Sequence, residues 1–169
     1  MLYYFYLAVV AVATCLHLLL GKRPVTGSRV VEVLLLYLLF IFIGLGGVVG
    51  FAGHTFKARE IALEIGWQPS PFQFEVAMAN LAFGVLGILC LWLRREFWTA
   101  TGIGAAVLLL GCAYGHLRDM ILHGNYAPYN VGPVFWLNDT AIPIVILILL
   151  LLRRHFTATQ TQPPAISVQ

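Results

Sequence analysis

The chain contains five apolar stretches, and each is close to the roughly 20 residues that a helix needs to cross a hydrocarbon core. They cover about residues 2–20, 30–52, 72–93, 97–122 and 136–152. Only 10% of the residues are charged, so few positions interrupt these stretches. A backbone in lipid must satisfy its own hydrogen bonds, and the alternating pattern of a membrane barrel is absent. The sequence therefore predicts an all-α integral membrane protein, a bundle of about five transmembrane helices.

The connecting segments are too short for a separate soluble domain, which predicts a single transmembrane domain over residues 1–156. The polar segment 157–169 is predicted to be a disordered cytoplasmic tail. The fifth stretch is short and carries Pro143, so we expect it to be tilted or kinked. Residues 58–66 have the pattern of a short amphipathic helix at the membrane interface, with Gly66 as its stop.

The basic residues are distributed unequally between the two sides that alternating helices define. One side receives seven of them: Lys22, Arg23, Arg29, Arg94, Arg95, Arg153 and Arg154. The other side receives three: Lys57, Arg59 and Arg118. By the positive-inside rule, the N-terminus is predicted to lie outside and the C-terminus in the cytoplasm. The basic clusters are short and border the helices, so we expect a lipid bilayer and not nucleic acid as the partner.

Most of the acids and histidines fall on the side predicted to be external. Those near the ends of the apolar stretches are His54, Glu75, His116, Asp119 and Asp139. Helix ends that meet at one level can bring such side chains together. We therefore predict a ligand-binding site, with candidate residues His54, Glu75, Asn80, His116, Arg118, Asp119, Asn130 and Asp139.

Two carboxylates and an imidazole are also a ligand set for zinc, iron or manganese. Glu75, His116 and Asp119 are the candidate ligands for such a divalent transition metal. The spacing is not diagnostic, because the chain has no H-E-x-x-H motif and no paired E-x-x-H motif. The metal is therefore a hypothesis about a cofactor, and whether the protein is an enzyme stays open.

Each candidate also has a purely structural interpretation. Asp139 can cap the N-terminus of its helix, and His116 and Asp119 can bond each other or Arg118. Glu75 can form an ion pair with Arg118. Six aromatic residues fit the belts at membrane interfaces and are assigned no chemistry: Tyr3, Tyr4, Tyr6, Trp67, Trp98 and Trp136.

Closely spaced glycines predict where the helices contact one another. Three pairs have this spacing: Gly46 with Gly50, Gly84 with Gly87, and Gly111 with Gly115. Small residues at such intervals allow two helix backbones to approach closely. We therefore expect the second, third and fourth stretches to form the tight centre of the bundle.

Several short stretches resemble an uncharacterised prokaryotic family of small polytopic membrane proteins. They are residues 53–56, 65–67, 70–81, 115–119 and 125–130, followed by Trp136 and Asp139. The resemblance covers roughly helices two to five. It implies one integral membrane domain in a prokaryotic inner membrane, and it implies no particular reaction or ligand.

Three hypotheses about function follow. The favoured one is a membrane protein that binds a metal or a small polar ligand in an external-facing vestibule. The alternative is a structural or accessory subunit of a larger membrane complex or a homo-oligomer, in which the polar residues fasten helices together. A transporter is the weakest, because the inner half of the stretches offers no continuous polar path.

Overall fold

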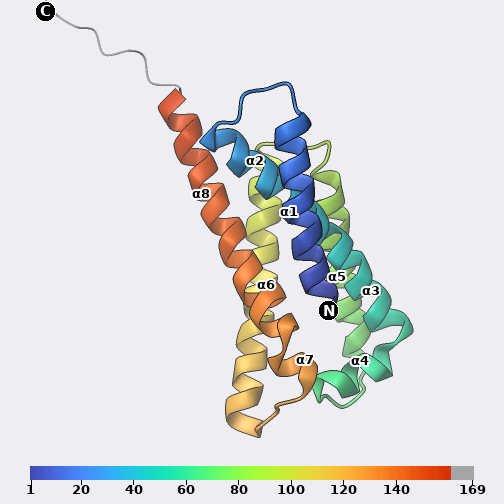
Figure 1. Ribbon diagram of the computed structural model, residues 1–169. Helices are drawn as coiled ribbons and strands as arrows, with labels where there is room; N and C mark the ends of the chain where they lie inside the picture. The colour runs from blue at the N-terminus through green and yellow to red at the C-terminus, as the bar shows by residue number, and fades with distance from the viewer. Residues whose placement is uncertain (161–169) are drawn as a thin grey trace, which may run out of the picture.

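Five helices of the chain are long and apolar enough to cross a membrane, which is the number that the sequence predicts. The computed structural model describes residues 1–160, and within these residues the chain is helical with no strand (Figure 1). The five helical stretches are Leu2–Leu20, Gly27–Phe56, Phe72–Leu89, Glu96–His123 and Pro128–Thr159.

The first two stretches form an antiparallel pair. Helix α1 (Leu2–Leu20) is followed by a helix that runs without a break through α2 (Gly27–Tyr37), η1 (Leu38–Leu45) and α3 (Gly46–Phe56). The Thr26 hydroxyl accepts a hydrogen bond from the Arg29 amide and so caps the start of α2. The segment η1 is π-helical, so the side chains of α3 are rotated relative to those of α2.

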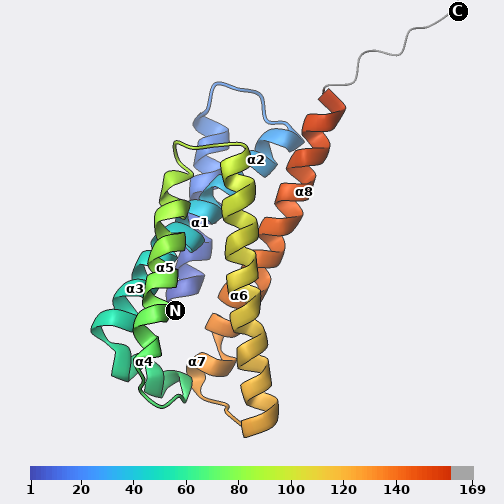
Figure 2. The ribbon, with the colours of Figure 1, turned by 180° about the vertical axis from the view of Figure 1, so that it is seen from behind.

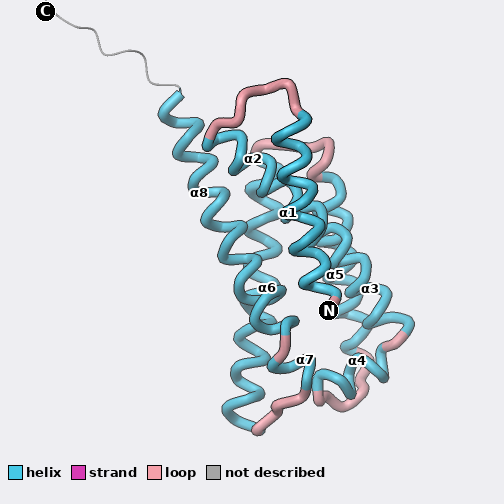
Figure 3. The backbone as a smooth tube through the Cα atoms, viewed as in Figure 1, coloured by secondary structure: helices cyan, strands magenta, loops and turns pink. Residues whose placement is uncertain are grey.

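The remaining elements follow in chain order: α4 (Ala58–Ile65), α5 (Phe72–Leu89), α6 (Glu96–His123), α7 (Pro128–Val131), η2 (Val134–Ala141) and α8 (Ile142–Gln160). The short helices α4 and α7 lie at one end of the bundle (Figures 1 and 2). The α1–α2 and α5–α6 loops lie at the other end, beside the final turns of α8 (Figure 3). The bundle therefore has two differently built ends.

The centre of the bundle is the long helix Gly27–Phe56, the most buried of the five. Leu35 and Leu39 are fully buried on it, and Ile146 of α8 is fully buried in the same apolar cluster. Helix α1, in contrast, leaves most of its side chains exposed. Apolar side chains on that outer surface are what a helix in contact with lipid requires.

The closest helix contact joins α3 and the end of η1 to α5, through glycines on both sides. A Cβ atom on Gly47 would lie 2.8 Å from the Cα atom of Gly84, and one on Gly84 would lie 3.2 Å from the Gly44 carbonyl oxygen. Gly87 meets the backbone of Gly44 in the same way. These four positions have no room for a side chain, which explains the glycines.

The glycine pattern is misleading for the fourth stretch. A Cβ atom on Gly111 or Gly115 would meet nothing within 4 Å, so these residues do not bring α6 against another helix. The prediction that the second, third and fourth stretches share one tight centre is therefore wrong. Spacing alone shows that a helix face is flat, and it does not show whether another helix covers that face.

The fifth stretch is longer than the sequence suggests. The π-helical η2 precedes α8, and the helix continues past Pro143 to Gln160. Hydroxyls in its last turns bond to carbonyls four residues earlier, as Thr157 does to Arg153 at 3.0 Å. Residues 157–160 are therefore helical where a tail was expected, and residues 161–169 lie outside the described part of the chain.

The short helix α4 occupies the segment in which the sequence predicts an amphipathic helix. It ends at Gly66, whose φ of +85° is a left-handed conformation that glycine adopts without strain. Asn125 donates a hydrogen bond of 2.9 Å to the Ile65 carbonyl, which ties this turn to the loop after α6. The helix therefore closes one end of the bundle.

Candidate ligand-binding site

A cavity of about 440 Å³ lies inside the end of the bundle that α4 and α7 close. Its walls come from α3, α5, α6 and η2, with Tyr3 of α1 and Trp67 of the α4–α5 loop. Most of the lining is apolar. The polar and ionisable exceptions include His54, Glu75, Asn80, His116, Asn138 and Asp139. A mostly apolar cavity of this size with a few polar groups is typical of small-molecule sites.

The central polar feature of the cavity is a buried pair of side chains. The Nε2 atom of His116 on α6 lies 3.4 Å from the Oδ2 atom of Asp139 on η2. Their side chains are only 7% and 5% exposed. Asp139 lies within the π-helical segment, and π-helical turns often occur at functional sites because they redirect side chains. The pair is thus held by two separate helices.

Asn130 fixes which ring nitrogen of His116 carries a proton. The Asn130 amide nitrogen donates to the carbonyls of His116 (3.3 Å) and Asn125 (2.8 Å). Its Oδ1 atom is therefore left to accept from the Nδ1–H of His116, at 2.6 Å. On the other side of the ring, the Nε2 atom faces the Oδ2 atom of Asp139. This contact is favourable only if one of these two atoms carries a proton.

Neighbouring side chains hold both members of the pair in place. The Asn138 amide donates to the Oδ1 atom of Asp139 at 2.8 Å, which leaves Oδ2 for His116. The Trp67 ring stacks on the His116 ring with centroids 6.0 Å apart, and the Phe135 ring meets it edge-on at 6.4 Å. The imidazole is therefore fixed in orientation, and the pair can present a donor or an acceptor to a molecule in the cavity.

The polar side chains on the opposite wall of the cavity make fewer hydrogen bonds within the protein. His54 of α3 forms a hydrogen bond between its Nδ1 atom and the Oε1 atom of Gln73 on α5. The amide nitrogen of Asn80 donates to the carbonyl of Val76 in its own helix, at 2.9 Å. Glu75 lines the cavity and is also exposed. These groups can supply further hydrogen bonds to a ligand.

Two of the eight predicted residues lie apart from this cavity. Asp119 contacts the Nδ1 atom of His123 at 2.7 Å and accepts from the Asn125 amide at 2.5 Å, so it fastens the end of α6 to the following loop. Arg118 is exposed and is not part of the cavity wall. The cavity is lined by five of the predicted residues: His54, Glu75, Asn80, His116 and Asp139. Asn130 does not line the cavity, but it forms a hydrogen bond to His116.

The predicted metal ligands are not brought together. His116 is directed to Asp139, and Asp119 is directed to His123 one turn further along α6. Across residues 1–160, no group of three or more His, Cys, Asp and Glu side chains could hold a metal ion. The structure therefore does not support the predicted metal site.

Sequence reasoning missed several residues of the site. Trp67 was assigned to an aromatic belt, and it stacks on His116 instead. Gln73 and Asn138 are polar residues at the edges of apolar stretches, which is the same signal that selects Glu75 and Asp139. Trp98 is likewise no belt residue, since it is buried and its indole N–H donates to the Cys90 carbonyl at 2.8 Å.

Fold and site together define an all-helical bundle with five helices apolar enough to cross a membrane and a mostly apolar cavity beside the His116–Asp139 pair. The chain belongs to a family of unknown function, DUF6790, which matches residues 1–159. No curated protein and no solved structure matches the chain. The membership agrees with the resemblance to an uncharacterised family.

Proposed function

We propose that the protein is a multi-pass membrane protein that binds a small, largely apolar molecule with one polar group in the cavity beside His116 and Asp139. The observation that carries the proposal is the buried pair itself. Burying two such groups is costly unless they are well paired, and well-packed apolar residues of the same volume often give equal or greater stability. Their position on the wall of a cavity favours a functional role over a purely structural one.

The distribution of charge supports an orientation for this site. Arg and Lys are concentrated at the end of the bundle that carries the α1–α2 and α5–α6 loops, which is the cytoplasmic side by the positive-inside rule. The cavity lies at the opposite end and would therefore face the outer half of the bilayer. A molecule that partitions into lipid could reach it without crossing water.

The chain offers a matched pair of variants for testing the cavity. Gly115 lines it, and a side chain added there would enter open space. Gly111 lies about one turn earlier on α6, is equally open, and does not line the cavity. Gly115→Phe therefore adds a ring at the cavity wall, where there is room for it, whereas Gly111→Phe places the same ring on the same helix outside the cavity.

The experiment extracts the protein purified in mild detergent with organic solvent and identifies retained small molecules by mass spectrometry. We expect a species that is present in the wild type and in Gly111→Phe and is lost from Gly115→Phe. Asp139→Leu should also lose it, because the substitution removes the polar group that selects it. Identical extracts from the wild type and both glycine variants would contradict the proposal.

A further inference from the structure

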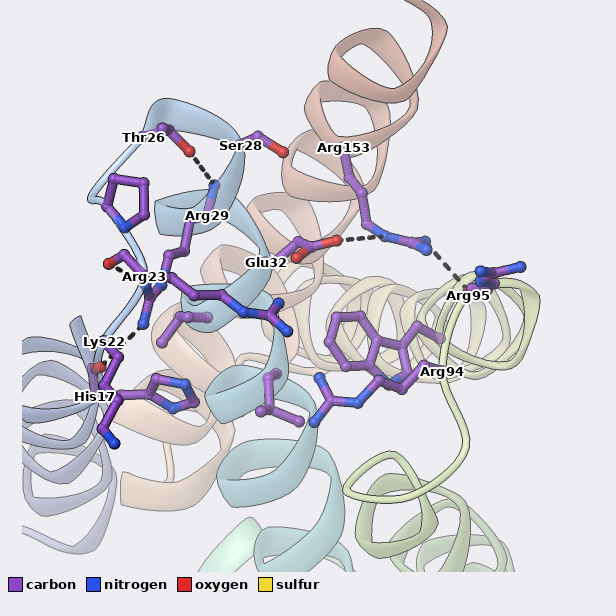
Figure 4. Close-up of a pocket in the computed structure, with 14 residues that line it drawn as sticks. His17, Lys22, Arg23, Thr26, Ser28, Arg29, Glu32, Arg94, Arg95 and Arg153 are labelled. Carbon is purple, nitrogen blue, oxygen red and sulfur yellow. Dashed lines mark hydrogen bonds and ion pairs between the residues drawn. The ribbon is translucent and has the colours of Figure 1, made fainter. Parts of the chain in front are cut away.

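A second cavity lies at the end of the bundle opposite the His116–Asp139 pair. Its volume is about 910 Å³, and it is formed by the α1–α2 loop, the start of α2, the α5–α6 loop and α8. Six basic side chains line it: Lys22, Arg23, Arg29, Arg94, Arg95 and Arg153. In Figure 4, Lys22, Arg23 and Arg29 lie on one side of the cavity, and Arg94, Arg95 and Arg153 lie on the other.

The positive charge of this basic cavity is almost uncompensated. Glu32 is the one carboxylate among its lining residues, and it lies 4.0 Å from the Nε atom of Arg153. Both side chains are partly exposed, so this ion pair is weak. Glu96 follows Arg95 in sequence but does not line the cavity. The ionisable lining of the cavity is therefore six positive groups, one negative group and His17.

Several of the guanidinium groups are held in position. Arg29 donates to the carbonyl of Arg23 and, at 3.5 Å, to that of His17. Arg94 and Arg153 lie over the ring of buried Trp98, 5.2 and 5.5 Å from its centroid. Positioned arginines lose less conformational freedom when they bind an anion, so they favour binding.

The loop that carries two of these arginines is strained. Arg95 has φ +58° and ψ −113°, and it is the one residue other than glycine with positive φ within residues 1–160. Its carbonyl accepts a hydrogen bond from the guanidinium of Arg153 at 3.2 Å, which fixes the loop against α8. Strained backbone persists where the surrounding structure enforces it, and such positions cluster at binding sites.

The floor of the basic cavity is apolar, formed by the buried residues Val33, Leu36 and Trp98. Electrostatic attraction is stronger beside such a floor than in open water. The positive-inside rule by itself explains basic residues at this end of the helices. It does not explain why arginines from separate segments converge on one cavity and leave its charge unneutralised.

We propose that the basic cavity binds a phosphate-bearing anion through several guanidinium groups at once. Guanidinium groups match phosphate oxygens in geometry, and basic pockets between membrane helices on the cytoplasmic side bind anionic lipid headgroups. The phosphate can come from an anionic phospholipid or from a free phosphate compound. This inference is independent of the proposed function, because the two cavities share no residue.

The experiment uses the full-length protein in mild detergent with two probes. Native mass spectrometry measures retention of phosphatidylglycerol against phosphatidylcholine, and calorimetry measures binding of inorganic pyrophosphate. The test variant is Arg94→Gln/Arg153→Gln. The control is Arg118→Gln/Arg154→Gln, which removes the same charge at two exposed arginines outside the cavity. We expect the test variant to weaken binding about tenfold or more and the control to change it less than twofold.

Preference for phosphatidylglycerol that is lost in the test variant alone would identify a lipid headgroup as the source. Binding of pyrophosphate that is lost in the test variant alone would identify a free phosphate compound as the source. Binding of neither probe, or equal weakening in test and control variants, would overturn the proposal.

A second test variant, Lys22→Gln/Arg95→Gly, keeps the test decisive if the first variant does not fold. Neither side chain makes a hydrogen bond or ion pair within the described residues, and glycine relieves the strain at position 95. It should therefore fold and still weaken binding. Unchanged binding of both probes by this folded variant would also count against the proposal.

Discussion

Replacing Gly47 by alanine should destabilise the bundle, whereas the same change at Gly111 should not. A Cβ atom on Gly47 would lie 2.6 Å from the Asn80 carbonyl oxygen and 2.8 Å from the Cα atom of Gly84. Ordinary contacts begin at 3.4 Å, so the two backbones must separate by 0.6–0.8 Å. Neither obstacle is a flexible side-chain end, so the whole contact between α3 and α5 must move.

The magnitude follows from two opposing effects. Alanine improves helix propensity over glycine by about 1 kcal/mol at either position. Overpacking costs about 1–3 kcal/mol, and it applies only to Gly47, because nothing lies within 4 Å of a Cβ atom on Gly111. Since the propensity gain is common to both variants, Gly47→Ala should have a free energy of unfolding about 1–3 kcal/mol below that of Gly111→Ala.

The assay is unfolding by sodium dodecyl sulfate in mixed micelles, followed by circular dichroism for the wild type and both variants. Because both changes are Gly→Ala within a helix, their difference isolates the contact between α3 and α5. Free energies of unfolding that agree within about 0.5 kcal/mol would refute the close glycine contact.

Three further predictions use the same unfolding assay. Gly66→Ala should lower the free energy of unfolding by about 1–2 kcal/mol, because φ is +85° there and a Cβ atom would meet the Asn125 side chain; an unchanged value would contradict the left-handed turn. Trp98→Phe should cost about 1 kcal/mol and speed hydrogen exchange in the α5–α6 loop, since it removes the bond to the Cys90 carbonyl. His123→Ala should cost less than about 1 kcal/mol, because its side chain is 63% exposed; a larger loss would mean that its pair with Asp119 carries more of the fold than its exposure suggests.

The sequence predicts the number and approximate position of the long helices because those depend on local properties. Apolar length determines whether a stretch can span lipid, and glycine at position 66 determines where a short helix ends. The pair of Asp119 and His123 is local as well, since the two residues lie one turn apart on α6, although the sequence interpretation pairs Asp119 with His116 or Arg118. Each of these features can be derived from residues fewer than about 30 positions apart.

The partners of the cavity residues could not be predicted in this way. His116 and Asp139 lie on different helices, and the π-helical η2 rotates Asp139 by an amount that a regular helical period does not give. Asn130, on the short helix α7, then fixes the imidazole. The sequence therefore predicts which end of the bundle carries most of the acids and histidines, and the irregular segments decide which of these groups meet.

The middle of the bundle, between the two cavities, is apolar and closely packed. The basic cavity opens at the end that carries the α1–α2 loop. The His116 cavity lies toward the end that carries α4 and α7. These two ends of the bundle are seen in Figure 1. Between them the long central helix buries Leu35 and Leu39 against Ile146 of α8, in an apolar cluster. A transport path would need polar groups or water through this region. Separate binding events at the two ends need only that the apolar middle stay closed, and its close packing favours that arrangement.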